Sequence, residues 1–177
     1  MRPASQLKIH NLMLSRPGTD SLDQLSGLAE HHPWLQLGIE ELSKTSLAQW
    51  QREFTRLFLD ARPMTIAPPF ESVYRHQQMQ GPVVERLSAL YRAAGLDDQG
   101  PAPDFLGTQL QFAAYLDEST DPRAQAWRER LWQDHLLDWL PGFVSDLCEH
   151  SRLLIYRLWG GQLSLLAAAK QRELAPA

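Results

Sequence analysis

Apolar residues recur along most of this chain at the three- and four-residue spacing that is typical of amphipathic helices. The stretch after Ser46 shows the pattern most plainly, with apolar side chains at Leu47, Trp50, Phe54, Leu57 and Phe58. Ser46 and Gln49 stand at the spacing of a capping box, which closes the first turn of a helix. The pattern therefore predicts a helix that begins after Ser46 and ends near Asp60.

Proline, glycine and aspartate divide the remaining apolar stripes into further segments. We expect helices over residues 21–30, 33–42, 82–94, 104–116, 122–139 and 143–159, with a short last helix before the C-terminus. The prolines between residues 63 and 69 exclude regular helix and predict an ordered loop. Pro141–Gly142 is expected to break or kink the chain, and Gly160–Gly161 to end a helix.

The choice of apolar residues indicates the fold class. The chain has 30 Leu but only 4 Val and 4 Ile, and β-branched residues favour strands whereas Leu favours helices. We predict an all-α protein, a single globular helical domain over residues 1–177 with about eight or more helices. Parallel-sheet enzymes are excluded, because their buried strands need runs of Val and Ile. Residues 97–103 read as a linker that would form a hinge between two halves.

Charge and hydropathy limit the kinds of partner. The 17 basic and 21 acidic residues give a formal net charge of −4, whereas nucleic acid and anionic membranes require a basic face. No apolar run approaches the roughly 20 residues that cross a bilayer, and the N-terminus does not resemble a secretory signal. We expect a cytoplasmic protein that binds no nucleic acid and does not insert stably into a membrane. Cys148, the only cysteine, is expected to be a packed thiol.

Motifs of catalysis and of metal binding are missing from the sequence. The six histidines include no H-x-x-x-H pair, and the adjacent His31 and His32 cannot share one helix face. The chain has no phosphate-binding loop, nucleophile elbow or dinucleotide-binding fingerprint. We therefore predict no catalytic residue, no metal site and no cofactor.

Three polar positions interrupt otherwise apolar surroundings. Glu71 and Ser72 lie in the aromatic-rich turn PPFESVY, which is expected to present both side chains; Asp104 precedes an apolar helix, and His135 lies in DHLLDWLPGF. Each position also has a structural interpretation: Glu71 as a cap of the next helix, Asp104 as the N-cap of its own helix, and His135 as a packed side chain. The spacing leaves both interpretations open.

Four segments, EFTRLFLD, PPFESVY, DFLGTQLQFAAYL and DHLLDWLPGF, occur in the order seen in one known family. From about Trp50 to Trp159 the chain resembles the redox-enzyme maturation chaperones of the TorD/DmsD type, and more distantly their NarJ relatives. The resemblance implies a cytoplasmic, all-helical, non-enzymatic protein. Such proteins bind the twin-arginine signal peptide, and sometimes the body, of a molybdopterin-containing oxidoreductase. They hold the enzyme back from export until its cofactor is inserted.

The resemblance also implies a peptide-binding surface. Carried over by position, it consists of Phe70, Glu71, Ser72, Val73, Tyr74, Asp104, Phe105, Leu106, Gly107, His135 and Leu136. Two positions depart from the family's P-x-D-H-[LI]-G segment: Phe105 stands where a histidine often follows the aspartate, and Ala102 where a proline is expected. The Asp–His pair is therefore absent, while Asp104 keeps its own role. Glu71 and Asp104 would meet the guanidinium groups of the signal peptide.

Two other functions stay open on the sequence. A NarJ-like assembly adaptor would dock a folded catalytic subunit without reading a signal peptide. Hydrolysis of a guanine nucleotide, suggested by the family, finds no phosphate-binding loop here. The sequence does not indicate which molybdoenzyme is the client, nor whether the protein is a monomer or a dimer that exchanges halves through the hinge.

Overall fold

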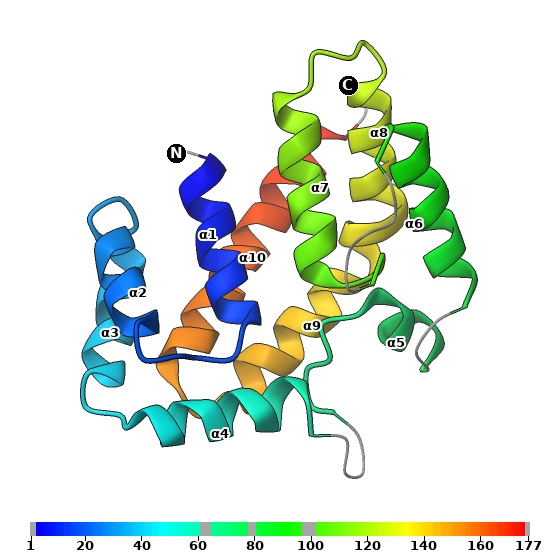
Figure 1. Ribbon diagram of the computed structural model, residues 1–177. Helices are drawn as coiled ribbons and strands as arrows, with labels where there is room; N and C mark the ends of the chain where they lie inside the picture. The colour runs from blue at the N-terminus through cyan, green and yellow to red at the C-terminus, as the bar shows by residue number, and fades with distance from the viewer. Residues whose placement is uncertain (1–2, 61–64, 78–80, 97–101, 176–177) are drawn as a thin grey trace. The chain divides into compact units, whose positions relative to one another are not determined.

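The computed structural model describes residues 3–60, 65–77, 81–96 and 102–175, and the chain within these ranges is helical, as predicted (Figure 1). An isolated antiparallel bridge between Phe70 and Phe105 is the nearest approach to a sheet in these ranges. The elements are α1 (Pro3–Leu14), α2 (Ser21–Ala29), η1 (Pro33–Leu35), α3 (Gln36–Leu42), α4 (Leu47–Phe58), α5 (Glu71–His76), α6 (Pro82–Ala93), α7 (Leu106–Glu118), α8 (Ala124–Leu131), η2 (Trp132–Leu136), α9 (Leu137–His150) and α10 (Leu154–Glu173).

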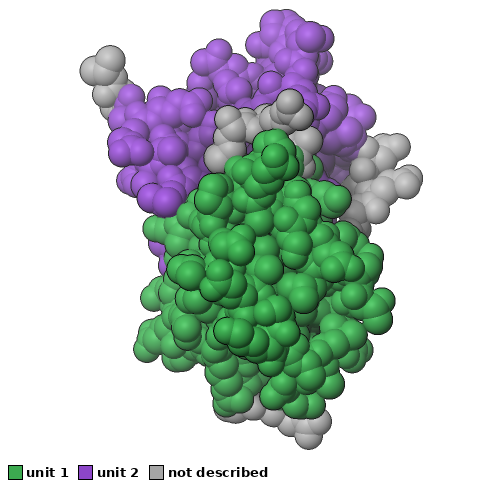
Figure 2. Space-filling model, turned by 90° about the vertical axis from the view of Figure 1, so that its left-hand side faces the viewer, with its two compact units in different colours: residues 1–68, 143–164 green, residues 69–142, 165–177 purple. Residues whose placement is uncertain are grey.

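The chain divides into two compact units, which Figure 2 shows in different colours. Unit 1 comprises residues 1–68 and 143–164, and unit 2 comprises residues 69–142 and 165–177. Most of the hinge predicted at residues 97–103 lies outside the described residues. The hinge and the number of domains therefore stay predictions. In the part of the chain that the structure describes, no helix is both long and apolar enough to span a bilayer.

Unit 1 contains the predicted amphipathic helix α4. The capping box is present, because Ser46 Oγ accepts a hydrogen bond from the Gln49 N–H at 3.3 Å and Gln49 Oε1 accepts one from the Ser46 N–H at 3.0 Å. On the buried face, Trp50 Nε1 donates to the Tyr156 hydroxyl at 3.0 Å. Phe58 packs edge-on against Tyr156, with 5.5 Å between ring centroids. This helix therefore has the position and the buried face that its sequence predicted.

Helix α1 was not predicted, because its apolar stripe is interrupted by polar residues. Its buried face combines Ile9 and Met13 with a histidine, His10. His10 fits in this apolar face because its Nδ1 accepts a hydrogen bond from Trp159 Nε1 at 2.9 Å. Burial first, and then the neighbouring His32, lower the pKa of His10 to about 4, so the ring is neutral near pH 7.

Two predicted helix ends are wrong: the chain does not break at Pro141–Gly142 or stop at Gly160–Gly161. Helix α9 continues through Pro141, and the buried side chains of Trp139 and Phe143 hold the chain on either side of it. Helix α10 continues through Gly160–Gly161. A Cβ atom at Gly160 would lie 2.6 Å from Cys148 Sγ, so this glycine permits close contact with α9. Burial raises the pKa of the Cys148 thiol.

In unit 2, helix α7 is buried along much of its length. In Figure 1, α7 and α8 run side by side, and the two helices are in contact. Leu106, Leu110 and Leu116 are buried along α7, and Tyr91 of α6 packs edge-on against Phe112 with 4.7 Å between ring centroids. These contacts hold α7 in unit 2, and the candidate site lies at the start of this helix.

Candidate functional site

Two predicted site segments meet at the start of α5. The Leu106 N–H donates to the Pro69 carbonyl at 2.9 Å, and the Glu71 N–H donates to the Asp104 carbonyl at 3.0 Å. The rings of Phe70 and Phe105 lie beside this bridge, with 5.4 Å between centroids. Residues 70–74 and 104–106 are therefore brought together within unit 2, as the resemblance implied.

Asp104 caps α5 rather than its own helix, so the structural interpretation of Asp104 as the N-cap of α7 is wrong. Helix α7 begins after Phe105 without a side-chain cap. Asp104 Oδ2 instead accepts a hydrogen bond from the N–H of Ser72, in the first turn of α5, at 3.1 Å. The first N–H groups of a helix have no partner within it. A buried carboxylate from another segment supplies that partner here.

Glu71 is buried at the centre of a polar network, whereas the sequence led us to expect it on an exposed turn. Its side chain is 0% exposed. Glu71 Oε2 accepts a hydrogen bond from Gln109 Nε2 at 2.8 Å, and Oε1 lies 2.9 Å from His135 Nδ1. Arg75 Nε lies 2.8 Å from Oε1 and forms an ion pair without an aligned hydrogen bond. A buried carboxylate needs such partners to offset its lost hydration.

His135 lies in a π-helical turn between α8 and α9. Over Trp132–Leu136 the helix widens, and the Leu137 N–H donates back to the Trp132 carbonyl. Such turns are rare and often occur at functional sites. Because the Glu71 carboxylate offers only acceptors, we assign a hydrogen to the facing Nδ1 of His135. The turn thus brings His135, 64 residues away in sequence, against α5.

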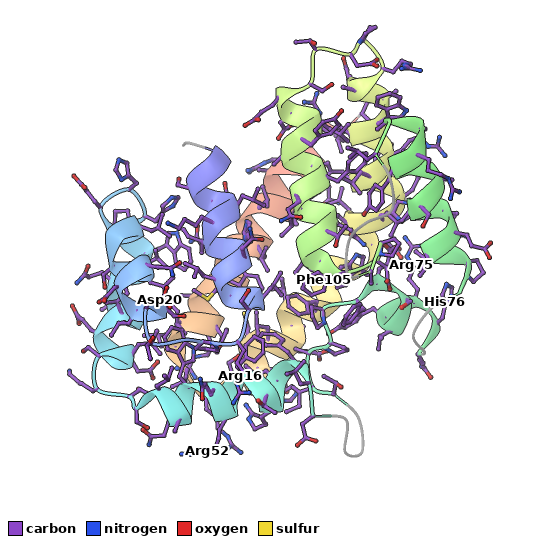
Figure 3. The ribbon with its side chains drawn as sticks, in the orientation of Figure 1. Arg16, Asp20, Arg52, Arg75, His76 and Phe105 are labelled. Carbon is purple, nitrogen blue, oxygen red and sulfur yellow. The ribbon has the colours of Figure 1, made fainter. Side chains whose placement is uncertain are left out.

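A surface pocket of about 400 Å³ adjoins this network and is lined by Tyr74, Arg75, His76, Asp138, Trp139 and Gly142. The rings of Tyr74 and Trp139 lie 5.6 Å apart, and Trp139 Nε1 donates to Gln109 Oε1 at 3.3 Å. Arg75 Nε lies 3.0 Å from Asp138 Oδ2, and the Asp138 side chain is 57% exposed. Figure 3 shows Arg75 and His76 on α5. The pocket therefore combines an aromatic wall, a cation and an accessible carboxylate.

The predicted site residues fall into two groups by burial. Glu71, Ser72, Asp104, Leu106, Gly107, His135 and Leu136 are buried. Phe70, Val73, Tyr74 and Phe105 are partly exposed. The first group holds the segments together, and the second borders solvent.

Sequence reasoning missed several residues of the network and pocket, namely Arg75, His76, Gln109, Asp138, Trp139 and Gly142. Arg75 follows Glu71 by four residues, a helical spacing that predicts an ion pair. Asp138 and Trp139 lie in the same DHLLDWLPGF segment as His135. In the described residues, no group of three His, Cys, Asp or Glu side chains is arranged to hold a metal ion.

Comparisons with known proteins match this fold. The family model of the nitrate reductase delta subunit matches residues 21–145, a range that includes every predicted site residue. The chain belongs to the nitrate reductase delta subunit family. A solved structure from Archaeoglobus fulgidus, provisionally assigned as a redox enzyme maturation protein, superposes with a TM-score of 0.68 and 23% identity over 92% of this chain and 91% of that one. The curated proteins give no match.

Family and fold confirm the resemblance drawn from the sequence. The family supports a redox enzyme maturation chaperone for molybdoenzymes, and it is a family of chaperones rather than of catalysts. At 23% identity, the Archaeoglobus structure bears on the fold alone.

Proposed function

We propose that the protein is a cytoplasmic chaperone that binds the twin-arginine signal peptide of a molybdopterin-containing oxidoreductase and assists cofactor insertion before export. The pocket beside α5 carries this proposal. Such a peptide offers guanidinium groups followed by an apolar stretch, and the pocket offers an accessible carboxylate beside two aromatic rings. Those two chemistries complement each other.

The carboxylates of Asp134 and Asp138 are the proposed partners of the peptide arginines. Their side chains are 61% and 57% exposed. Arg75 of α5 donates to the backbone carbonyl of Asp134 in η2 and pairs with the Asp138 carboxylate in α9. Both aspartates therefore lie beside α5. An incoming guanidinium that takes Asp138 leaves Arg75 paired with the buried Glu71. The exchange therefore leaves neither Arg75 nor the buried Glu71 without a counter-charge.

The partly exposed apolar residues of the predicted surface would receive the rest of the peptide. Tyr74 lines the pocket, and Val73 precedes it on α5. Phe70 and Phe105 form the bridge at the start of the same helix. Burial of apolar surface contributes about 25 cal/mol per Å². Ordering a flexible peptide costs several kcal/mol, roughly 2–5. The resulting affinity is moderate, which suits a partner that is later released.

The buried members of the predicted surface serve as positioning residues in this proposal. Asp104 fixes the first turn of α5, and Glu71 holds Arg75 and His135. Gln109 links Glu71 to the pocket side chain Trp139. Peptide contact by the Glu71 and Asp104 carboxylates themselves would require α5 to move.

Calorimetry with a synthetic peptide of the pattern Ser-Arg-Arg-x-Phe-Leu-Lys tests the proposal. Asp138→Asn is expected to weaken binding about five-fold or more, since charge-assisted pairs are worth 1 kcal/mol or more. Asp117→Asn is the matched control, because it breaks another surface Asp–Arg pair of unit 2, 3.0 Å from Arg128. Equal affinities for wild type and Asp138→Asn would contradict the role of this pocket.

The family match also favours a second candidate, an assembly adaptor that docks a folded catalytic subunit. The two candidates differ in what the chaperone retains. A signal-peptide chaperone captures the leader alone and loses a client whose leader has been deleted. An adaptor captures the leaderless subunit and ignores the isolated leader, so a pull-down with both forms separates them.

A further inference from the structure

A second and larger pocket lies in unit 1, along the solvent side of α4. Its volume is about 850 Å³, and four arginines line it: Arg16, Arg52, Arg56 and Arg152. They come from three parts of the chain, namely the connection between α1 and α2, helix α4, and the connection between α9 and α10. Figure 3 labels Arg16 and Arg52 on the first two of these. The gathering is notable in a chain whose net charge is −4.

The four arginines outnumber the two acidic residues of the lining, Glu53 and Asp60, so part of this positive charge is uncompensated. Arg56 holds Glu53 through two hydrogen bonds of 2.8 and 2.7 Å, and the backbone N–H of Arg152 donates to the same carboxylate at 2.7 Å. Burial alone would raise the pKa of Glu53, but these hydrogen bonds outweigh it and lower the pKa below its ordinary value. The Glu53 carboxylate is thus occupied by Arg56 and by the Arg152 backbone, and it does not neutralise the other arginines at contact distance. Asp60 is the other acidic residue of the lining.

Three guanidinium groups remain to face a ligand. Arg16, Arg52 and Arg152 are exposed and form no ion pair with a carboxylate of the described chain. The guanidinium group binds carboxylates and phosphates through paired hydrogen bonds. The pocket is therefore suited to an anion that carries more than one negative group.

The shape and lining of the pocket favour a peptide over a nucleotide. Its α4 residues run from Ala48 to Arg56, which spans about 12 Å of helix axis. An extended peptide advances about 3.3 Å per residue, so carboxylates at alternate positions fall within reach of separate arginines. The described residues of the lining include no aromatic ring for a base to stack on, and its other members are mostly Thr and Gln.

We infer that this pocket docks an acidic segment of the client protein, at a site separate from the one proposed for the signal peptide. The inference rests on the proposed chaperone function, because it assigns a second contact with the same client. A basic leader and an acidic body segment would then be held by pockets of opposite chemistry. Because arginine–carboxylate contacts at an open pocket are screened by salt, the second contact weakens as ionic strength rises.

Fluorescence anisotropy with a labelled peptide of alternating Glu and Ser tests this inference. We expect binding at low salt that weakens at high salt, and an affinity at least about ten-fold lower for Arg16→Gln/Arg52→Gln/Arg152→Gln. The glutamine side chains keep polarity and remove charge. The Arg152 backbone bond to Glu53 is retained, and circular dichroism checks the fold. If the triple variant is unfolded, Arg52→Gln alone, exposed on α4, takes its place with a smaller expected loss.

The control variant Arg86→Gln/Arg92→Gln/Arg172→Gln removes the same charge from exposed positions of unit 2 and should bind the acidic peptide like wild type. Equal loss in both triple variants would overturn the inference, since general charge would then explain binding. Inorganic pyrophosphate binding at this pocket without peptide binding would also overturn it, by indicating a small anion. Leader-peptide affinity is expected to be unchanged in the pocket variant. If the leader fails to bind any form, the signal-peptide proposal fails while the acidic-peptide result still stands.

Discussion

Asp104 Oδ2 accepts a hydrogen bond from the backbone N–H of Ser72 at 3.1 Å, although 32 residues separate the two in sequence. The contact fixes the first turn of a six-residue helix, α5. So short a helix is marginal by itself. Because Tyr74, Arg75 and His76 all project from α5 into the proposed pocket, the position of that pocket depends on a buried contact that the peptide does not touch.

Removing this cap should destabilise the protein. We expect Asp104→Ala to lower the free energy of unfolding by about 1–2 kcal/mol, because the Ser72 N–H is left without a partner in a buried place. Asp20→Ala is the control, since Asp20 stands at the N-cap position of α2 but makes no side-chain cap there. Urea denaturation measures both. Equal losses in the two variants would show that Asp104 is not an effective cap.

The two carboxylates beside Arg75 should differ sharply in their effect on stability. Glu71→Ala leaves Arg75 without its buried counter-charge and His135 Nδ1 without its acceptor, and we expect a loss of about 3–5 kcal/mol. Asp138→Ala removes a partner at the surface and should cost less than about 1 kcal/mol. Chemical denaturation compares the two variants directly. If Glu71→Ala proved as mild as Asp138→Ala, the buried network would not hold α5.

The paired glycines of α10 give a test of close helix packing. Gly160→Ala places a methyl group 2.6 Å from Cys148 Sγ, and we expect a loss of about 1–3 kcal/mol. Gly161→Ala meets no atom within 4 Å and should be neutral or stabilising by up to about 1 kcal/mol. The double variant Gly160→Ala/Cys148→Ala should recover part of the loss. Thermal unfolding of the three variants measures these effects, and lack of any recovery would place the strain elsewhere.

His10 should make stability depend on pH below neutrality. Its pKa is about 4 in the folded protein against 6.5 for the free side chain, so the unfolded chain binds more protons between these values. The contribution of neutral His10 to the free energy of unfolding is therefore fully present above pH 6.5. It is lost as the pH decreases toward 4, by about 3 kcal/mol in total. Denaturation midpoints across this range for wild type and His10→Gln measure the contribution. The exposed His31→Gln is the control and should keep the wild-type slope.

Sequence predicted the elements whose own residues determine them. The capping box at Ser46 and the apolar face of α4 were both readable from local spacing. The helix ends predicted at Pro141 and Gly160 were wrong, and the role of Gly160 depends on a contact with the distant Cys148 that local spacing does not reveal. Helix α1 was missed because its buried face includes His10, whose acceptor role depends on Trp159 far along the chain.

For the candidate site, the resemblance pointed to segments that lie together in the fold but did not predict their burial. Glu71 and Asp104 were expected to face a ligand, and both are buried by partners that no local spacing reveals, such as Ser72 and His135. The exposed carboxylate nearest the pocket, Asp138, lies three residues after His135 in a segment that the sequence had already singled out. Distinguishing the two kinds of carboxylate required the tertiary contacts.

Amide chemical-shift mapping with the leader peptide tests the central claim most directly, because it reports where the peptide binds without any substitution. We predict that the shifts concentrate on α5 and on residues 134–142, with Tyr74 and Asp138 among the most perturbed. The same titration with a twin-lysine peptide should give smaller shifts at the same positions, since lysine lacks the paired donors of arginine. Shifts confined to unit 1, or none at a saturating concentration of the leader, would contradict the account.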